Sequence, residues 1–416
     1  MTLAAVTAGA ACLSLGVHLV SCASAARPRR GAKRPEFGRP PVTIVQPHRG
    51  VEAFSSETLA SIFALDYPAC EIVFCLADAG DPIAPIIRRF IAAHPQQPAR
   101  LLIGDDPISG NPKLNNVVKG WKAAKYDWIV LADSNVLMPP DYLDRLLARW
   151  RKNTGIVCSP PIGSRPVGFA AALECAFLNT YQARWQYAAE AFGYGFAHGK
   201  SMLWRRAVLE EAGGIEALAS EIAEDAAATK LLRNAGLSAH LVDEAFAQPL
   251  GRRSFADVWK RQVRWARLRR KTFALHFLPE LFTTSLMAIG AAAFAAPVED
   301  LRPVCAALLA AAIWYGAEIA LAQRRGWAIG AWTAPAWILR DLLLPWLWLQ
   351  ALASDRFEWR GAALSVNGET LAAEGPDIRR NRHCEERSDK AIHAAAGALS
   401  GWPAISRRWI ASLRSQ

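Results

Sequence analysis

The stretch from residue 3 to residue 26 restricts the possible folds of this chain more than any other feature. It carries no formal charge and is rich in Ala, Leu and Val. A stretch of this length can cross a hydrocarbon core of roughly 30 Å, where every backbone polar group must be paired within the segment. No Lys or Arg precedes it, and the residues that follow are basic: Arg27, Arg29, Arg30, Lys33 and Arg34. We therefore expect a transmembrane helix over residues 1–26, with the chain then continuing in the cytoplasm.

Two other readings of this stretch exist. The letters LVSC at residues 19–22 resemble a lipoprotein processing site, and the following small residues could suit cleavage of a secretory signal. Both kinds of leader begin with a positively charged region, which is missing here. The charge distribution therefore favours a retained membrane anchor.

The net charge of +11 over 416 residues indicates anionic partners. The basic residues mostly flank apolar runs and do not alternate with stacking aromatics, which favours an anionic membrane surface over nucleic acid. The eight cysteines form no CxxC pair, which argues against a zinc site. No pattern in the chain calls for an obligate protein partner.

A second apolar cluster occupies residues 281–297, 303–322 and 327–351. The third run contains Arg340 and Asp341, and ionisable groups inside a membrane are costly. We therefore expect membrane segments over 279–352, with two crossings and a third run that is interfacial or re-entrant. Residues 376–416 lack clean periodicity, and we expect a disordered tail there.

Short apolar runs alternate with helical patterns between the two hydrophobic regions. The runs predict buried strands at residues 42–46, 71–77, 100–103 and 128–132, and the patterns predict helices near 52–65, 82–94 and 113–124. This alternation indicates an α/β fold with a Rossmann-like parallel sheet covered by helices on both faces. We assign it to residues 40–250.

Polar side chains follow the predicted strands where each one ends. They are Asp78 and Asp81 after the second strand, Lys113 and Asn115 after the third, and Asp133 after the fourth. Loops are polar in any case, but ligands of such sheets bind at the carboxyl ends of the strands. The chain has no GxGxxG motif and no Walker lysine loop, which disfavours a dinucleotide or P-loop site. The pattern favours a nucleotide diphosphate held through Mg²⁺ or Mn²⁺ on Asp133, with Lys113 as a point charge and Asp78 or Asp81 near uracil or ribose.

Two further segments carry candidate catalytic groups. Glu224 and Asp225 open a predicted helix and precede three alanines, which leave the carboxylates accessible to an acceptor hydroxyl. Acidic residues there could also simply complement the helix dipole. Residues 251–278 predict a basic amphipathic helix on anionic lipid, in which Arg261 and Arg264 share a face beside Trp265. An arginine pair of this kind can stabilise a departing diphosphate.

The glycine-rich letters FGYGFAHGK at residues 192–200 leave two interpretations open. Their glycines could let the backbone pass close to a ligand, or they could form an ordinary turn. His198, in the same stretch, could meet a phosphate or an acceptor, but a single histidine is more often structural.

Five motifs resemble one family in their order and spacing. They are ADAGDP, NPKLNN, ADSN, AEDAAATK and RQVRW, between about residues 40 and 275. The chain thereby resembles the ceramide glucosyltransferases and their bacterial relatives in glycosyltransferase family 21. The resemblance implies a GT-A fold, a UDP-sugar donor, a divalent metal and a membrane lipid hydroxyl as acceptor.

The resemblance also implies roles for individual residues. Asp81, with Asp78 close by, would serve the nucleotide, and Asp133 the diphosphate and metal. Asp225 would be the catalytic base, and the RQVRW letters match the family's (Q/R)xxRW element. Asn135 departs from the DxD triad of many related enzymes, which weakens the expectation of strict metal dependence.

We expect an inverting hexosyltransferase of the bacterial inner membrane, multi-pass, with its catalytic domain on the cytoplasmic side. Relatives that glycosylate hopanoids or glycerolipids share much of the pattern, so the acceptor stays open. A processive polysaccharide synthase uses the same fold and a related element. A membrane scaffold with a degenerate site is the non-enzymatic alternative, and Asn135 is its best support.

Overall fold

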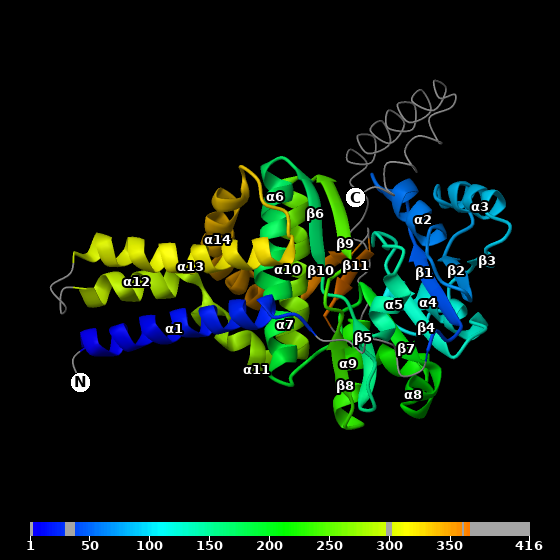
Figure 1. Ribbon diagram of the computed structural model, residues 1–416, viewed down its shortest axis with the longest axis horizontal. Coiled ribbons are helices and arrows are strands. Elements are labelled where there is room, and N and C mark those ends of the chain that lie inside the picture. Colours follow the sequence, from blue (N-terminus) through cyan, green and yellow to red (C-terminus); the bar gives the residue numbers. More distant parts are fainter. Residues whose placement is uncertain (1–2, 30–37, 297–301, 360–361, 367–416) are drawn as a thin grey trace, which may run out of the picture. The chain divides into compact units, whose positions relative to one another are not determined.

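A seven-stranded sheet forms the centre of the chain in the computed structural model, which describes residues 3–29, 38–296, 302–359 and 362–366 (Figure 1). The strand order is β3-β2-β1-β4-β7-β5-β8. The strands are β1 (Val42–His48), β2 (Cys70–Leu76), β3 (Ala99–Ile103), β4 (Trp128–Ala132), β5 (Thr154–Cys158), β7 (Ser201–Arg205) and β8 (Ser238–Leu241). The four strands predicted from the sequence are β1 to β4, and they pair in parallel. The predicted α/β fold is confirmed.

One strand that the sequence did not predict runs against the others, so the sheet is mixed and its parallel part includes the four predicted strands. Strand β7 pairs antiparallel with β4 on one side and with β5 on the other. Its register sets Ser201 opposite Ala132, and Lys200 then lies across from Asp133. The backbone N–H of Asp133 donates to the carbonyl of Lys200 at 3.0 Å. Strand direction was not visible in the sequence, because a short apolar run looks the same in either direction.

Helices cover both faces of the sheet, as the alternating pattern indicates. Because side chains of a strand alternate in direction, Ile44 of β1 packs into the core with Leu59 of α2, while Val45 packs into the other core with Val117 of α4. The helices of this region are α2 (Ser55–Phe63), α3 (Ala84–Ala93), α4 (Pro112–Ala123), α5 (Tyr142–Leu147), α8 (Arg206–Glu211), a 3-10 turn (Ile215–Ser220) and α9 (Glu224–Asn234).

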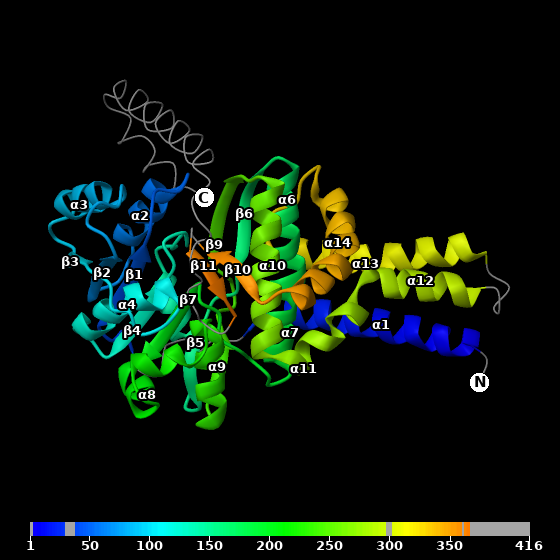
Figure 2. The same cartoon turned by 180° about the vertical axis from the view of Figure 1, so that it is seen from behind.

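A long helical rod and a two-stranded ribbon lie between the sheet and the hydrophobic helices (Figures 1 and 2). The rod consists of α6 (Phe169–Cys175), a π-helical segment (Ala176–Ala183) and α7 (Arg184–Ala191). The ribbon pairs β6 (Ile162–Val167) with β9 (Ala247–Arg252), and α10 (Phe255–Thr272) follows it. A hairpin of β10 (Arg356–Trp359) and β11 (Ala362–Ser365) ends the described chain.

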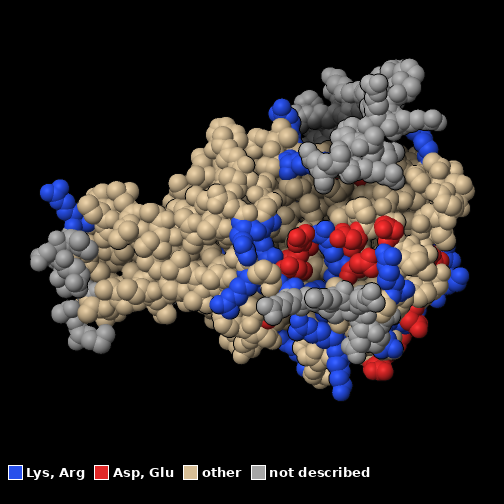
Figure 3. Space-filling model, viewed as in Figure 1, with Lys and Arg blue, Asp and Glu red and all other residues tan. Residues whose placement is uncertain are grey.

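Three hydrophobic helices lie side by side in both views (Figures 1 and 2): α1 (Leu3–Ala26), α12 (Ser285–Ala295) and α13 (Pro303–Arg325). Most of their surface shows no charged side chain in the view of Figure 3. Among the described residues, two helices are long and apolar enough to cross a membrane, Ala5–Ala26 and Pro303–Arg325. A third span results if Ala274–Leu281 and Ser285–Ala295, which bend by 43°, are counted as one.

The remaining hydrophobic helix, α14 (Thr333–Ala353), is not among those candidates and packs instead against α6, α10 and the π segment. Its Arg340 is buried but fully paired. The guanidinium contacts Glu318 of α13 at 2.9 Å, the neighbouring Asp341 at 2.8 Å and Thr180 of the π segment at 2.6 Å. The carboxylate of Glu318 thus offsets the cost of burying this charge, which the sequence alone left unexplained.

The predicted tail at 376–416 lies outside the described residues.

Candidate active site

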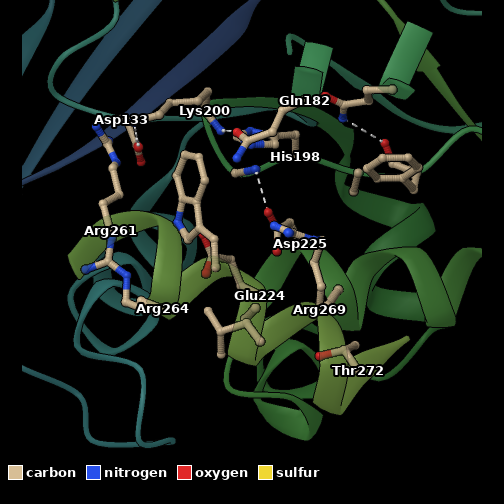
Figure 4. Close-up of a pocket in the computed structure, with 18 of the residues that line it drawn as sticks. Asp133, Gln182, His198, Lys200, Glu224, Asp225, Arg261, Arg264, Arg269 and Thr272 are labelled. Atoms are coloured by element: carbon tan, nitrogen blue, oxygen red, sulfur yellow. Dashed lines mark hydrogen bonds and ion pairs between the residues drawn. The ribbon is translucent and has the colours of Figure 1, made fainter. Parts of the chain in front are cut away.

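A cavity of about 910 Å³ opens at the carboxyl ends of β1 and β4. Its walls come from α4, α9, α10, the rod and the segment that leads into α12. The predicted site residues that line it are Lys113, Asp133, Asp225, Arg261, Arg264 and Trp265. In Figure 4 Asp133, Lys200, His198 and Asp225 face the same space, and Arg261 and Arg264 enter from α10. The fold therefore collects at one place groups that are more than 150 residues apart in the chain.

The floor of the cavity is a cluster of alternating charges around Asp133. One carboxylate oxygen of Asp133 lies 2.7 Å from the ammonium of Lys113, and the other lies 2.8 Å from that of Lys200. Lys113 also contacts Glu224 at 2.6 Å, and Lys200 donates to the amide oxygen of Asn135 at 3.0 Å. Lys113 thereby links the end of β4 to the start of α9.

The start of α9 is held by partners from two loops. The carboxylate of Glu224 accepts from the side-chain amide of Asn111 at 2.7 Å. Asn111 also caps α4, because its side-chain oxygen accepts from the backbone of Lys113 and Leu114. Beside Glu224, Asp225 accepts from the backbone N–H of Gly199 at 3.1 Å and faces the cavity.

Burial and neighbouring charges shift the pKa values of these groups. Burial, together with the adjacent Glu224, raises the pKa of Asp225 to about 6. Burial would also raise the pKa of Asp133, but Lys113 and Lys200 outweigh it and hold that pKa well below its usual range. Burial, with the charge of Lys200, lowers the pKa of His198 to about 3. At neutral pH Asp133 is therefore ionised, His198 is neutral, and Asp225 titrates close to the working range of a general base.

The RQVRW element contributes cations held by a buried acid. Arg261 forms an ion pair with Glu174 of α6, and Arg253 approaches the other oxygen of Glu174 at 3.4 Å. The guanidinium of Arg261 lies 5.0 Å from the ring centre of Trp265, and the ring of His198 meets that of Trp265 edge-on at 6.2 Å. Trp265 thus separates the arginine from the histidine and forms a flat wall, as its pattern predicts.

The other basic residues of α10 are largely paired with protein groups. Lys260 contacts Glu358 at 3.3 Å, Arg269 contacts Glu280 at 2.7 Å, and Arg270 pairs with Asp355. The partners come from the segments that flank the hydrophobic helices, and two of them, Glu358 and Asp355, lie far from α10 along the chain. Part of the charge expected to face anionic lipid is thus used inside the protein, and contact of this helix with a membrane surface stays a prediction.

Apolar side chains gather in one part of the lining, beside polar ones such as Arg269, Thr272 and Glu280. The apolar ones are Trp185 of α7 and Phe196, with Phe273, Leu275 and Phe277 from the segment after α10. That segment comprises α11 (Ala274–Phe277) and a 3-10 turn (Leu278–Thr283), and it belongs to the bent third candidate span. Leu275 is 82% exposed. The cavity therefore joins a charged floor to an apolar wall beside the hydrophobic helices.

Three predicted residues lie outside the lining of this cavity. Asp78 is exposed and accepts from the backbone of Gly80. Asp81 accepts from the backbone N–H of Gly50 at 2.8 Å and so holds the loop that carries Arg49, which does line the cavity. The side chain of Asn115 accepts from Ile108 and Ser109 and shapes their loop, whereas its neighbour Asn116 lines the cavity.

The groups around Asp133 fit a metal only together with a substrate. Within the parts of the chain that the structure describes, no three His, Cys, Asp or Glu side chains are grouped to hold a metal. Asp133 and Asn135 nevertheless line the cavity, where Lys113 and Lys200 contact their oxygen atoms. Mg²⁺ commonly takes only one or two protein carboxylates and fills its remaining positions with substrate phosphates and water. A divalent cation is therefore compatible with the donor set when a diphosphate supplies further ligands.

Sequence reasoning missed Lys200, Glu174 and Asn111. Lys200 could have been found only from the antiparallel pairing of β7 with β4. Glu174 lies in an apolar helix, where a lone carboxylate signals a buried ion pair but not its partner. Asn111 precedes a proline at a helix start, which is a recognisable capping signal.

Gly199, in the glycine-rich stretch, lies against side chains of the cavity. A Cβ atom there would lie 2.7 Å from Glu224 and 3.0 Å from Lys113, both in the cavity. The backbone at this glycine therefore passes close to side chains of the cavity, and a side chain here would require the ends of Glu224 and Lys113 to shift.

Comparison with known proteins agrees with this geometry. The model of glycosyl transferase family 21 matches residues 5–372. Ceramide glucosyltransferase 1 of Caenorhabditis elegans is 28% identical over 237 residues, which are 56% of this chain and 51% of that protein. Ceramide glucosyltransferase 3 of the same organism is 23% identical over 359 residues, 84% of this chain and 77% of that protein. This chain thus spans about half the length of the first relative.

A solved structure shares the fold. It is a mannosyltransferase from Pyrobaculum calidifontis in complex with GDP-Man and Mn²⁺, with a TM-score of 0.51 and 21% identity, and the match covers 83% of this chain and 99% of that one. Since the family model extends over most of the residues, including the whole charged floor and the RQVRW element, the chain belongs to glycosyl transferase family 21.

Proposed function

We propose that the protein transfers a sugar from a UDP-sugar to a hydroxyl group of a membrane lipid such as ceramide, with inversion at the anomeric carbon. One observation carries the proposal: Asp225 lies in the cavity that joins the charged floor to the apolar wall. A nucleotide diphosphate suits the floor and a lipid chain suits the wall. The reacting hydroxyl then meets the sugar beside a carboxylate whose pKa is raised to about 6.

The donor end supplies positive charge for the diphosphate. Lys113 contributes from the floor, and Arg261 and Arg264 from α10. The uridine would extend toward the rim near Arg49. Asp81 holds the loop of Arg49 from outside the cavity and, with Asp78 beside it, stays the candidate for contact with the nucleoside.

The proposed reaction is a single displacement. Asp225 takes the proton of the acceptor hydroxyl as its oxygen forms a bond to the anomeric carbon, and the bond from that carbon to the diphosphate breaks. The transition state resembles an oxocarbenium ion, and no covalent intermediate is needed. The negative charge that develops on the departing UDP is stabilised by the cations of the floor and of α10.

A divalent cation belongs to the proposal. Asp133, with the amide oxygen of Asn135, would hold Mg²⁺ or Mn²⁺ against the diphosphate. When bound, the cation would act as a Lewis acid that neutralises charge on the phosphate oxygens. The Mn²⁺ in the mannosyltransferase structure, which has the same fold, supports this role.

The hydrophobic helices support a lipid acceptor at a membrane. The apolar wall belongs to the segment that leads into α12, so a lipid could reach Asp225 while its chains stay in the bilayer. We place the catalytic domain on the cytoplasmic side of a bacterial inner membrane, because the basic residues follow α1 directly. The names of the curated relatives support glucose as the sugar and ceramide as the acceptor.

Mass spectrometry of host lipids, with the gene expressed and with an Asp225→Asn control, tests the proposal. A new glycolipid is expected only with the wild type; its mass increase names the sugar and its fragments name the acceptor. A hexosylated hopanoid or glycerolipid would keep the reaction and change the acceptor. A ladder of sugars would point to a processive synthase. Unchanged lipids, together with no release of UDP from UDP-sugars by purified protein, would overturn the proposal.

A further inference from the structure

Lys200 is a buried cation that lies outside the five sequence motifs, and the sequence assigned it no role. It is 6% exposed, yet it lines the cavity. Its ammonium has three donor hydrogens. Two are directed to Asp133 at 2.8 Å and to Asn135 at 3.0 Å. Among the residues that the structure describes, these are its side-chain partners, so one donor remains for a ligand in the cavity.

The charge balance of the floor depends on Lys200. Lys113 is shared between two carboxylates, Asp133 and Glu224. Those three groups alone carry a net charge of −1, which would repel a diphosphate at contact distance. Lys200 brings the four-residue floor to neutrality. It is the member whose charge is shared with only one carboxylate.

Asn135 fits the same arrangement. A carboxylate at this position would give Lys200 a second anionic partner and would restore a net negative floor. The amide accepts a hydrogen bond from Lys200 but takes none of its charge. The departure from a DxD triad at Asn135 and the lysine that directly precedes β7 are thus joined by a hydrogen bond.

We infer that Lys200 is a donor-binding and catalytic residue that contacts the diphosphate and stabilises it as the leaving group. The inference rests on the proposed function. It adds that the chain supplies a buried cation of its own beside Asp133. Part of the affinity for a nucleoside diphosphate therefore does not depend on a divalent ion. An arginine should replace Lys200 in part, because it keeps the charge but not the compact shape.

Calorimetry on the purified full chain in detergent tests this inference, with UDP and uridine as probes, each in EDTA and in Mn²⁺. The variants are Lys200→Met and Lys200→Arg, and Lys122→Met is the matched control, since Lys122 pairs with Glu216 on the surface. In EDTA, Lys200→Met should bind UDP about ten- to a hundredfold more weakly, the effect of losing one charged hydrogen bond. Uridine binding should not change. Lys200→Arg should lie between Lys200→Met and the wild type, and Lys122→Met should match the wild type.

The outcomes separate this inference from the proposed function. Equal UDP affinity of the wild type and Lys200→Met in EDTA would overturn the role of Lys200 and leave the proposed function standing. An equal loss for UDP and uridine would also overturn it, because a general distortion of the site would then explain the effect. If thermal melting shows that Lys200→Met does not fold, Lys200→Gln takes its place in the calorimetry. The same differences in UDP and uridine affinity are then expected. A wild type that binds neither UDP nor uridine, with or without Mn²⁺, would overturn the donor assignment, and this inference with it.

Discussion

The backbone N–H of Gly199 donates a hydrogen bond of 3.1 Å to the carboxylate of Asp225. This contact orients the carboxylate of the proposed base, which lines the cavity. A side chain at 199 would displace the ends of Glu224 and Lys113, both of which belong to the charged floor. The hydrogen bond therefore fixes the position of the turn that carries Lys200 relative to the helix that carries Asp225.

Replacing Asp225 by Asn should remove the base and keep the hydrogen bond from Gly199. Activity should fall about 10²- to 10⁴-fold, the usual contribution of a positioned general base. UDP release and glycolipid formation by purified protein measure it. The melting temperature should be maintained, because a desolvated carboxylate is replaced by a neutral amide. Wild-type rates in Asp225→Asn would remove this residue from the mechanism.

The pH dependence should show an acid limb near pH 6. Below this pH Asp225 is protonated and cannot accept a proton, so kcat/KM should fall about tenfold for each further pH unit. Glu224→Gln removes a negative charge that raises the pKa of Asp225, and the limb should move to lower pH. Glu216→Gln, which alters an exposed ion pair with Lys122, is the control and should leave the profile in place. An acid limb at the same pH in Glu224→Gln as in the wild type would contradict the effect of Glu224 on the pKa of Asp225.

Removing divalent cations should lower activity without destroying the fold. EDTA should suppress UDP release, and added Mg²⁺ or Mn²⁺ should restore it, since a single carboxylate and a diphosphate can hold the ion. Asp133→Asn should lose most of this stimulation. Paramagnetic resonance of Mn²⁺ with UDP present gives a direct measure of binding. Full activity in chelator would show that Asp133 holds no metal during the reaction.

The ion cluster of Arg340 should be important for stability. Arg340→Met leaves Glu318 and Asp341 buried without their cation, so the free energy of unfolding should fall by about 3–5 kcal/mol. Thermal unfolding in detergent measures the change. Arg324→Met, at an exposed position of α13, should have little effect. A stable Arg340→Met variant would mean that water or lipid headgroups reach the two carboxylates.

Much of the fold could be predicted because its signals are local. Strands β1 to β4 are short buried runs between helical patterns, and α9 and α10 begin close to where the acidic pair and the amphipathic pattern place them. Asp133 and Asp225 were found because each lies at the end of such an element, and Arg261 because it lies in the amphipathic pattern of α10. Asn115 was chosen over Asn116 because sequence spacing does not tell which side of a first helical turn faces the ligand.

The sequence by itself determined the class of the protein: a Rossmann-like domain between hydrophobic helices, with carboxylates at the strand ends and an arginine element after them. These features depend on periodicity and on contacts between near neighbours in the chain. Only the tertiary structure decided that β7 runs antiparallel, that Lys200 therefore meets Asp133, and that Glu318 neutralises Arg340. Each of these pairs joins residues from separate elements. The cost of burying their charges is offset only when the elements pack and bring the opposite charges together.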